Sequence, residues 1–554
     1  MKRRAAAGTL ASLGRIGRHH APGLAARKLD LLRRLARSRL PSARLVLRLH
    51  ELLCFLDAYP DDRQVHRQVR RMLRHFGRRP DLQTHRQALA GTGIAGTDTP
   101  FRFYFPTAHW ITRHWPGALA LDRNDPDAVR ELLAALPSLL DPLRAEWLAG
   151  LHPTDLAPLD QLAPARMTDA DFVIGLIADM PGDEFSREAF GDRLDLSYVL
   201  RARRDTPERT NARFGTEATQ FQQSPLRTGY ADLRVEARRK PQRVRALRRR
   251  DALAAIRLAR ISMITRERDL AAFQFANPGD AFLVEDGRGL AFAMMGVLPA
   301  RRATLTTAYT ALTLKNGVPI GYIQADVLGR HGALSFNTFE TFRGAEAAHV
   351  FARFIAIAYH LFGCTDFSVE PYQLGLGNEE GIESGAWWFY HRFGFRPRAP
   401  AARRLAARES SRRSASSGYR SSPNTLRRLA RSHLFYSLDR MQQSRLPRTH
   451  HWLAAATRAL RHFPRSGGDN RSAGAADAAS KRLGLAKNRR LDRGVRSMLE
   501  RWAGLVLALT ARGRWSRSER RNLLRLIESK AGPNERKFHR RVLRHHRLRR
   551  LLDC

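Results

Sequence analysis

The chain has 554 residues, of which 43% are hydrophobic, and a formal net charge of +45. The length predicts three or four domains, and the ordinary hydrophobic fraction excludes a chain that is mostly disordered. Only 8 of the 97 basic residues are lysines, and this arginine excess should attract polyanions, although a GC-rich genome would produce the same bias.

The cysteine spacing, the hydropathy and the N-terminal sequence exclude further classes of protein. Cys54, Cys364 and Cys554 lie far apart without a CxxC or Cys/His cluster, so we expect neither a disulfide framework nor a metal site. No run of about 18 apolar residues predicts a transmembrane segment, and no signal peptide is visible. The first 29 residues lack acidic side chains, as organelle transit peptides do, but acid-poor stretches recur throughout the chain. We therefore interpret this start as a basic helix and expect a cytoplasmic protein.

The first third of the chain is expected to be largely helical. Leucines at amphipathic spacing predict a basic helical N-terminal region over residues 1–98, with a turn and helix cap at 59–62. Residues 99–198 predict a mixed, mostly helical domain whose aromatic cluster is either a small core or a base-stacking platform. The charged, apolar-poor segment 199–235 predicts a linker or arm.

From residue 236 to 408 the pattern predicts a sheet with helices. Strands are expected at 244–247, 281–284, 290–297, 305–314, 318–328, 333–339 and 367–370. Helices are expected at 251–263, 267–276, from 343 to 362, and around 386–393. Asn316-Gly317 predicts a tight hairpin, because both residues tolerate the positive φ that such turns need.

Two motifs in this region suggest a binding site for a phosphorylated cofactor. Arg343-Gly344 turns the chain into a helix whose first residues are small, and free N–H groups at such a helix start suit a pyrophosphate. The second motif, 386–395, reads Ala-Trp-Trp-Phe-Tyr-His-Arg-Phe-Gly-Phe.

Together these residues resemble the GNAT superfamily of acetyl-CoA-dependent N-acyltransferases, over about residues 236–408. The resemblance implies an α+β fold, a GNAT-like mixed sheet flanked by helices, and acetyl-CoA or another acyl-CoA as donor. It implies that the pantetheine arm lies between two splayed strands and that Tyr390 protonates the departing thiolate. Residues matching the pyrophosphate turn and its vicinity are Arg343, Gly344, Ala345, Ala347, Ala348 and Asn378.

Acyl transfer to an amine also needs a base, and carboxylates are the natural candidates. Glu340, at the end of the strand before the turn, is the first candidate, followed by Glu370 and then Asp326. The sequence departs from the family at Glu346, where glycine is usual, and at Glu383, where the family tends to place asparagine. A carboxylate at Glu346 would oppose a pyrophosphate unless it points away.

The remainder of the chain is basic. Residues 409–424 predict a disordered linker rich in serine and arginine, and 425–554 predict a basic helical region. Within it, helices are expected at 425–438, 452–463, 499–510 and 517–529, with a Gly/Ser/Ala linker at 464–477. The basic final helix could bind nucleic acid, anionic lipid or an acidic partner such as acyl carrier protein.

The sequence leaves two main hypotheses for the function, and a third is kept as an alternative. The first is a GNAT-like N-acyltransferase that moves an acyl group from acyl-CoA to an amine of an unknown, anionic or macromolecular acceptor. The second is a non-catalytic GNAT-fold scaffold or nucleic-acid-binding protein, for which Glu346 is the telling residue. The third, an aminoacyl-tRNA-dependent transferase with a duplicated fold, requires a second GNAT-like unit within residues 99–198.

Overall fold

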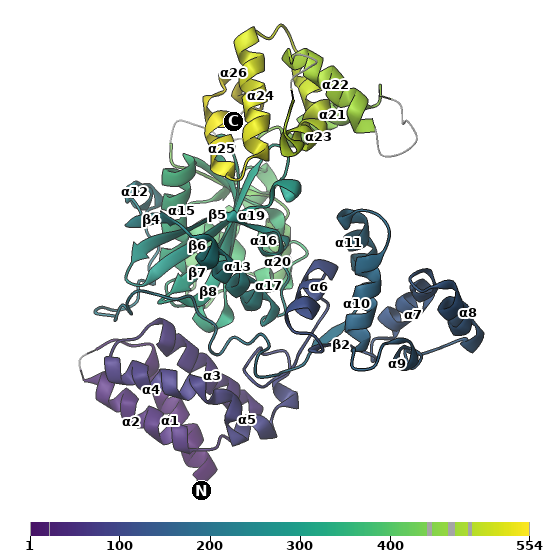
Figure 1. Ribbon diagram of the computed structural model, residues 1–554. Coiled ribbons are helices and arrows are strands. Elements are labelled where there is room, and N and C mark those ends of the chain that lie inside the picture. Colours follow the sequence, from purple (N-terminus) through teal and green to yellow (C-terminus); the bar gives the residue numbers. More distant parts are fainter. Residues whose placement is uncertain (1, 22, 440–445, 464–470, 486–489, 553–554) are drawn as a thin grey trace. The chain divides into compact units, whose positions relative to one another are not determined.

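A computed structural model describes residues 2–21, 23–439, 446–463, 471–485 and 490–552 (Figure 1). The chain divides into two compact units. The first comprises residues 1–226, 254–274 and 315–319, and the second comprises 227–253, 275–314 and 320–554. The segments expected at 1–98 and 99–198 thus belong to the first unit, and most of the GNAT-like segment belongs to the second.

The first unit begins with packed helices, as the leucine spacing predicts. They are α1 (Lys2–Gly17), α2 (Leu24–Arg37), α3 (Ala43–Ala58), α4 (Arg63–Arg74) and α5 (Pro80–Thr84). The expected cap at the start of α4 is present, since the Asp62 carboxylate accepts hydrogen bonds from the N–H groups of Gln64 and Val65.

The rest of this unit surrounds a small antiparallel sheet of order β1-β3-β2. Its elements are β1 (Thr99–Phe101), α6 (Phe105–His114), β2 (Leu119–Leu121), α7 (Pro126–Ala135), α8 (Pro142–Leu151), α9 (Leu159–Leu162), α10 (Asp169–Asp179), α11 (Glu184–Arg193) and β3 (Tyr198–Leu200). Phe103, Phe105 and Trp115 are buried in its core, which favours packing over base stacking for the aromatic cluster. Three short strands do not make the second large mixed sheet that the duplicated-fold hypothesis requires.

The second unit is built on a mixed sheet of nine strands in the order β11-β12-β10-β9-β8-β7-β6-β5-β4. The strands are β4 (Arg243–Ala246), β5 (Ala276–Gly287), β6 (Leu290–Val297), β7 (Thr307–Lys315), β8 (Val318–Leu328), β9 (His331–Thr338), β10 (Asp366–Val369), β11 (Arg396–Pro397) and β12 (Leu434–Ser437). Strands β9 and β10 are parallel, whereas β8 and β9 are antiparallel. The predicted α+β class with a large mixed sheet flanked by helices is therefore confirmed.

Helices connect the strands along the chain. They are α12 (Leu233–Arg238), α13 (Arg249–Ile264), α14 (Ala271–Gln274), α15 (Ala347–Phe362), α16 (Pro371–Leu374), α17 (Glu379–Glu383), α18 (Ala386–Arg392), α19 (Pro400–Ala415) and α20 (Pro423–Ala430). Residues 254–274, which comprise most of α13 and all of α14, belong to the first unit. The predicted hairpin between β7 and β8 is confirmed, with φ of 50° at Asn316 and 80° at Gly317. Helix α15 ends at Gly363, which adopts the left-handed conformation that glycine favours.

Three sequence-based expectations differ from the structure. The helix expected at 267–276 shrinks to α14, because β5 already begins at Ala276. The helix expected at 425–438 ends at Ala430 and is followed by β12, whose Leu434 and Tyr436 alternate into the core and insert this strand between β10 and β11. The linker expected to be disordered at 409–424 instead continues α19 to Ala415, where the buried Glu409 accepts a 2.6 Å hydrogen bond from the Ser421 hydroxyl.

The basic C-terminal region forms a helical bundle, drawn in green and yellow in Figure 1. Its helices are α21 (Thr449–Leu460), α22 (Arg471–Leu483), α23 (Arg493–Thr510), α24 (Arg517–Ala531), α25 (Glu535–Arg544) and α26 (His546–Leu552). Of the linker expected at 464–477, residues 464–470 lie outside the described residues and the rest lie in α22.

A buried polar network ties the bundle to the sheet. The Lys530 ammonium donates a 2.7 Å hydrogen bond to the Thr306 carbonyl and forms an ion pair with Glu535. Arg302, 1% exposed, donates to the carbonyls of Lys530 and Pro533. Buried charges are tolerated in proteins when they are paired in this way.

Among the helices in the described part of the chain, none combines the length and the apolar character needed to cross a membrane. Cys54 and Cys364 are both buried and form no disulfide. Burial raises the pKa of each thiol, which disfavours the reactive thiolate and supports the interpretation of Cys364 as packing.

Candidate active site

Strands β9 and β10 diverge after a short stretch of parallel pairing. Their parallel register covers only residues 331–333 of β9, which pair with 366–368 of β10. Strand β9 then continues to Thr338, and over this part it pairs with β8 but no longer with β10. A parallel pair that opens in this way leaves room for an extended ligand against the unpaired side of β9.

The turn after β9 leads into helix α15. Gly344 adopts φ of 77°, a conformation that side-chain-bearing residues rarely take, and this allows the sharp turn before α15. No side chain caps the helix at its first residue, because Glu346 occupies the N-cap without a capping hydrogen bond. The small residues Ala347 and Ala348 follow, so the start of α15 presents backbone rather than bulk.

A cavity of about 240 Å³ lies where these elements meet. It collects side chains from the end of β9, the turn, the start of α15, the α16–α17 segment and α18. Its lining comprises Phe336, Asn337, Thr338, Arg343, Gly344, Ala347, Gln373, Asn378, Glu380, Gly381, Ser384, Ala386, Phe389 and Tyr390. Five residues predicted for the site are thus brought together, namely Arg343, Gly344, Ala347, Asn378 and Tyr390. Ala345 and Ala348 are buried nearby but are not part of the lining.

Tyr390 is fixed by aromatic packing. Its ring lies edge-on to Phe351 at 5.4 Å and to Phe389 at 5.3 Å, between ring centroids. Burial raises the pKa of the Tyr390 hydroxyl well above its usual value, and a hydrogen bond from the Phe336 backbone partly opposes the shift. The hydroxyl therefore stays protonated at neutral pH and lies beside the strand whose edge is open.

Both acidic residues around the turn have partners. The Glu346 carboxylate is 7% exposed, accepts a 3.2 Å hydrogen bond from the Arg227 backbone and does not line the cavity. The Glu346 side chain is therefore held outside the cavity. Glu380 does line the cavity and forms an ion pair with Arg343.

The Asn378 side chain forms hydrogen bonds within its own loop. Its side-chain oxygen accepts a hydrogen bond from the Gly381 backbone and caps α17, and its amide nitrogen donates to the Tyr372 carbonyl at 3.1 Å. Gly375 and Gly377, with φ of 116° and 67°, shape the turn that brings it to the cavity.

The candidate bases lie outside this lining. Glu340 is exposed in the short 3-10 turn after β9, and Glu370 is exposed at the start of α16. Asp326 on β8 is half-buried and accepts hydrogen bonds of 3.2 and 3.0 Å from Gln324. Burial raises the pKa of Asp326 to about 6, and the charge of Glu370 adds to the shift.

Asp326 and Tyr390 approach opposite faces of the sheet. Asp326 is paired in register with Ala333, and directly paired residues share a face. Phe336, three residues further along β9, points to the other face, where its ring contacts Phe351 of α15 at 5.5 Å.

Sequence reasoning missed several lining residues, including Gln373, Glu380 and Ser384. They belong to α16, α17 and the following turn, and only the Gly-rich stretch before Asn378 signalled that this segment folds over the site.

Within the described part of the chain, no group of three or more His, Cys, Asp or Glu side chains could hold a metal ion. No protein-family model, curated protein or solved structure matches this chain.

Proposed function

We propose that the second unit is an acyl-CoA-dependent N-acyltransferase of the GNAT type. The observation that carries the proposal is the cavity in which Tyr390 meets the turn residues Arg343, Gly344 and Ala347 beside the open edge of β9. The family resemblance supplies the chemistry: an acyl-CoA bound here would present a thioester to an amine. The residues that would hold it are those of the turn and the uncapped start of α15, where backbone N–H groups favour phosphate oxygens.

Arg343 would change partner on binding. Its guanidinium pairs with Glu380 at the edge of the cavity, and both side chains are about one-third exposed. An exposed pair of this kind is worth at most about 1 kcal/mol, so a phosphate with two negative charges can compete for the arginine.

Asp326 is the best-placed base for the acceptor amine. Because it lies on the face opposite Phe336, the acceptor would approach from that face while the donor occupies the cavity on the other. Its pKa near 6 leaves it ionised at neutral pH, as a base must be. Glu340, the first candidate from the sequence, is exposed and outside the cavity lining, which makes it the weaker choice.

Calorimetric titration tests the donor site. Acetyl-CoA and longer acyl-CoAs are titrated into the full chain, into Arg343→Glu and into Tyr390→Phe, with Tyr359→Phe as the matched control. Tyr359 lies on α15, is 36% exposed and is not part of the cavity. We expect binding that is lost in Arg343→Glu and retained in both tyrosine variants. Absence of binding for every acyl-CoA, in a chain shown by circular dichroism to be folded, would overturn the proposal.

Thiol release with a panel of primary amines then tests the chemistry. Tyr390→Phe should lower turnover about 10²–10⁴-fold at unchanged affinity, the usual range for a lost general acid. Asp326→Asn should abolish the rise of turnover with pH near 6, whereas Glu340→Gln should leave it in place.

One observation favours the alternative, a scaffold or polyanion-binding protein. Asn522, Lys537, Arg540, Arg541, Arg544 and His545 line a cavity of about 440 Å³ on α24 and α25, and this lining contains no carboxylate. Nucleic-acid binding that weakens steeply with salt, in a chain that binds no acyl-CoA, would favour this function.

A further inference from the structure

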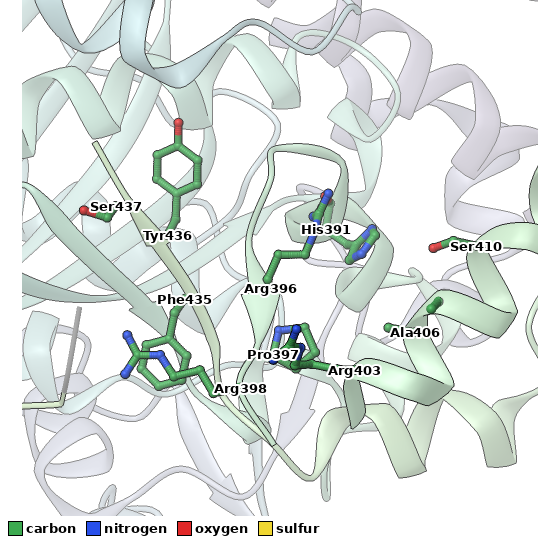
Figure 2. A pocket seen from close by; sticks show the side chains of 11 residues that line it. His391, Arg396, Pro397, Arg398, Arg403, Ala406, Ser410, Phe435, Tyr436 and Ser437 are labelled. Carbon is green, nitrogen blue, oxygen red and sulfur yellow. The ribbon is translucent and has the colours of Figure 1, made fainter. Parts of the chain in front are cut away.

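Another cavity of the second unit is lined by arginines. It measures about 760 Å³ and lies between the end of α18, β11, β12 and α19 (Figure 2). Its lining comprises His391, Arg396, Pro397, Arg398, Arg403, Ala406, Ala407, Ser410, Phe435, Tyr436 and Ser437. Three guanidinium groups and no carboxylate belong to this set. A concave site with charges of one sign concentrates counter-ions, because the surrounding protein focuses the field.

Arg396 is held in place by the backbone. Its Nη1 atom donates to the carbonyls of His391, near the end of α18, and of Phe395, just before β11, at 2.7 and 2.9 Å. Arg403, from α19, is exposed, and its guanidinium makes no hydrogen bond or ion pair with the described residues. The cavity is therefore lined by one guanidinium that backbone carbonyls hold in place, that of Arg396, and by one without a partner among the described residues, that of Arg403.

The third arginine combines charge with an aromatic surface. The Arg398 guanidinium lies over the Phe435 ring (Figure 2), and its central carbon is 3.9 Å from the ring centre. Pro397 is buried and forms an apolar part of the wall, beside the half-buried Phe435. His391 contributes no positive charge at neutral pH, because burial and the neighbouring Arg396 and Arg413 lower its pKa to about 4.

We propose that this cavity binds a small organic phosphate that carries at least two negative charges. Guanidinium groups match phosphate oxygens in charge and in paired hydrogen-bond geometry. The volume falls within the range of about 300–1,000 Å³ typical of small-molecule sites and leaves room beyond the phosphates. The apolar wall of Pro397 and Phe435 would contact the organic part.

This site is distinct from the cavity beside Tyr390. The two linings share no residue, although Tyr390 and His391 are neighbours on α18. The inference therefore stands whether or not the acyltransferase proposal holds.

Titration of the full chain with ADP and with inorganic pyrophosphate, at physiological ionic strength, tests the proposal. Arg403→Glu removes a lining arginine that has no hydrogen-bond or ion-pair partner in the part of the chain that the structure describes. Arg404→Glu is the matched control, since Arg404 is the next residue on α19, equally exposed and outside the lining. Arg343→Glu reports on the other cavity.

We expect ADP to bind and Arg403→Glu to weaken it about tenfold or more, the loss typical of one charge-assisted hydrogen bond. Arg404→Glu and Arg343→Glu should each change the affinity less than about threefold, within the effect of a remote screened charge. Tighter binding of ADP than of pyrophosphate would support the role of the apolar wall.

Three results would overturn the inference. Equal losses in Arg403→Glu and Arg404→Glu would show that only the general positive charge attracts the probe. Loss of ADP binding in Arg343→Glu alone would place the probe in the cavity beside Tyr390. Binding of single-stranded RNA or DNA without any binding of ADP or pyrophosphate would assign the arginines to a macromolecular surface.

Discussion

The ion pair between Arg353 and Asp286 offers a sharp test of how the second unit is held together. The two side chains are 2% and 3% exposed, and their bidentate hydrogen bonds measure 2.6 and 2.8 Å. Arg353 also donates to the Glu236 and Arg239 carbonyls, so it fastens α12 and β5 to the helix that forms the candidate site. Asp286→Ala would leave the guanidinium buried without its main counter-ion. Breaking one partner of a buried pair costs about 3–5 kcal/mol, and we expect a loss in that range.

The pair is tested by a double-mutant cycle. Asp286→Ala, Arg353→Met and the double variant are compared in urea unfolding and in hydrogen exchange of peptides from α15, which reports on this unit separately from the first. The double variant should recover most of the loss, because neither charge is then left unpaired. Arg239→Ala is the control, since its ion pair with Glu236 is half exposed and worth about 0–1 kcal/mol. A loss below about 1 kcal/mol for Asp286→Ala, or strict additivity in the double variant, would refute the reasoning.

Three further predictions concern single positions. Asp326 has a pKa of about 6 in the folded chain against an ordinary value of 3.8, so stability should fall as pH rises from about 4 to 6, and Asp326→Asn should flatten that fall in pH-dependent urea unfolding. Gly317→Ala would place a methyl group against the Phe214 carbonyl, whereas the methyl group of Gly344→Ala would meet nothing within 4 Å. In thermal unfolding, Gly344→Ala should lower the free energy of unfolding by about 1–2 kcal/mol, the cost of the left-handed conformation alone, and Gly317→Ala should lower it by more. Lys530→Met should cost about 3–5 kcal/mol by removing the closest counter-ion of the buried Glu535 carboxylate, which would retain only Arg302 at 3.8 Å, and a loss below about 1 kcal/mol in chemical denaturation would contradict that role.

The sequence predicted best where one local rule dominates. Asn316-Gly317 tolerates positive φ, and the hairpin forms there. Helix α15 follows from a continuous apolar stripe, and Gly363 ends it as expected. At 425–438 the same reasoning failed, because β12 depends on pairing with β10 and β11, strands that are distant along the chain. No local periodicity encodes such a partner.

In the candidate site, too, the residues carried by local motifs could be predicted from the sequence, and those brought in by tertiary contacts could not. Arg343, Gly344 and Tyr390 were predictable because a turn and a helix motif carry them. Glu380 and Gln373 were not, since their presence in the cavity depends on how α16 and α17 fold back over the turn. The helical continuation through Glu409 was missed because its neighbours are serines and arginines, and its burial depends on hydrogen bonds from Tyr419 and Ser421 beyond the end of the helix.

The packing of Tyr390 and its proposed role support each other. The sequence left open whether this tyrosine is a buried aromatic or an acid, and in the structure Tyr390 is buried and also lines the cavity. Burial raises the pKa of the phenol, which by itself would make the proton harder to give up. The same low-polarity surroundings would disfavour an anionic sulfur beside it and raise the proton affinity of that sulfur in parallel. In the proposed reaction the acid and the leaving group would thus stay matched, and the aromatic packing of α18 would serve both the core and the proton transfer.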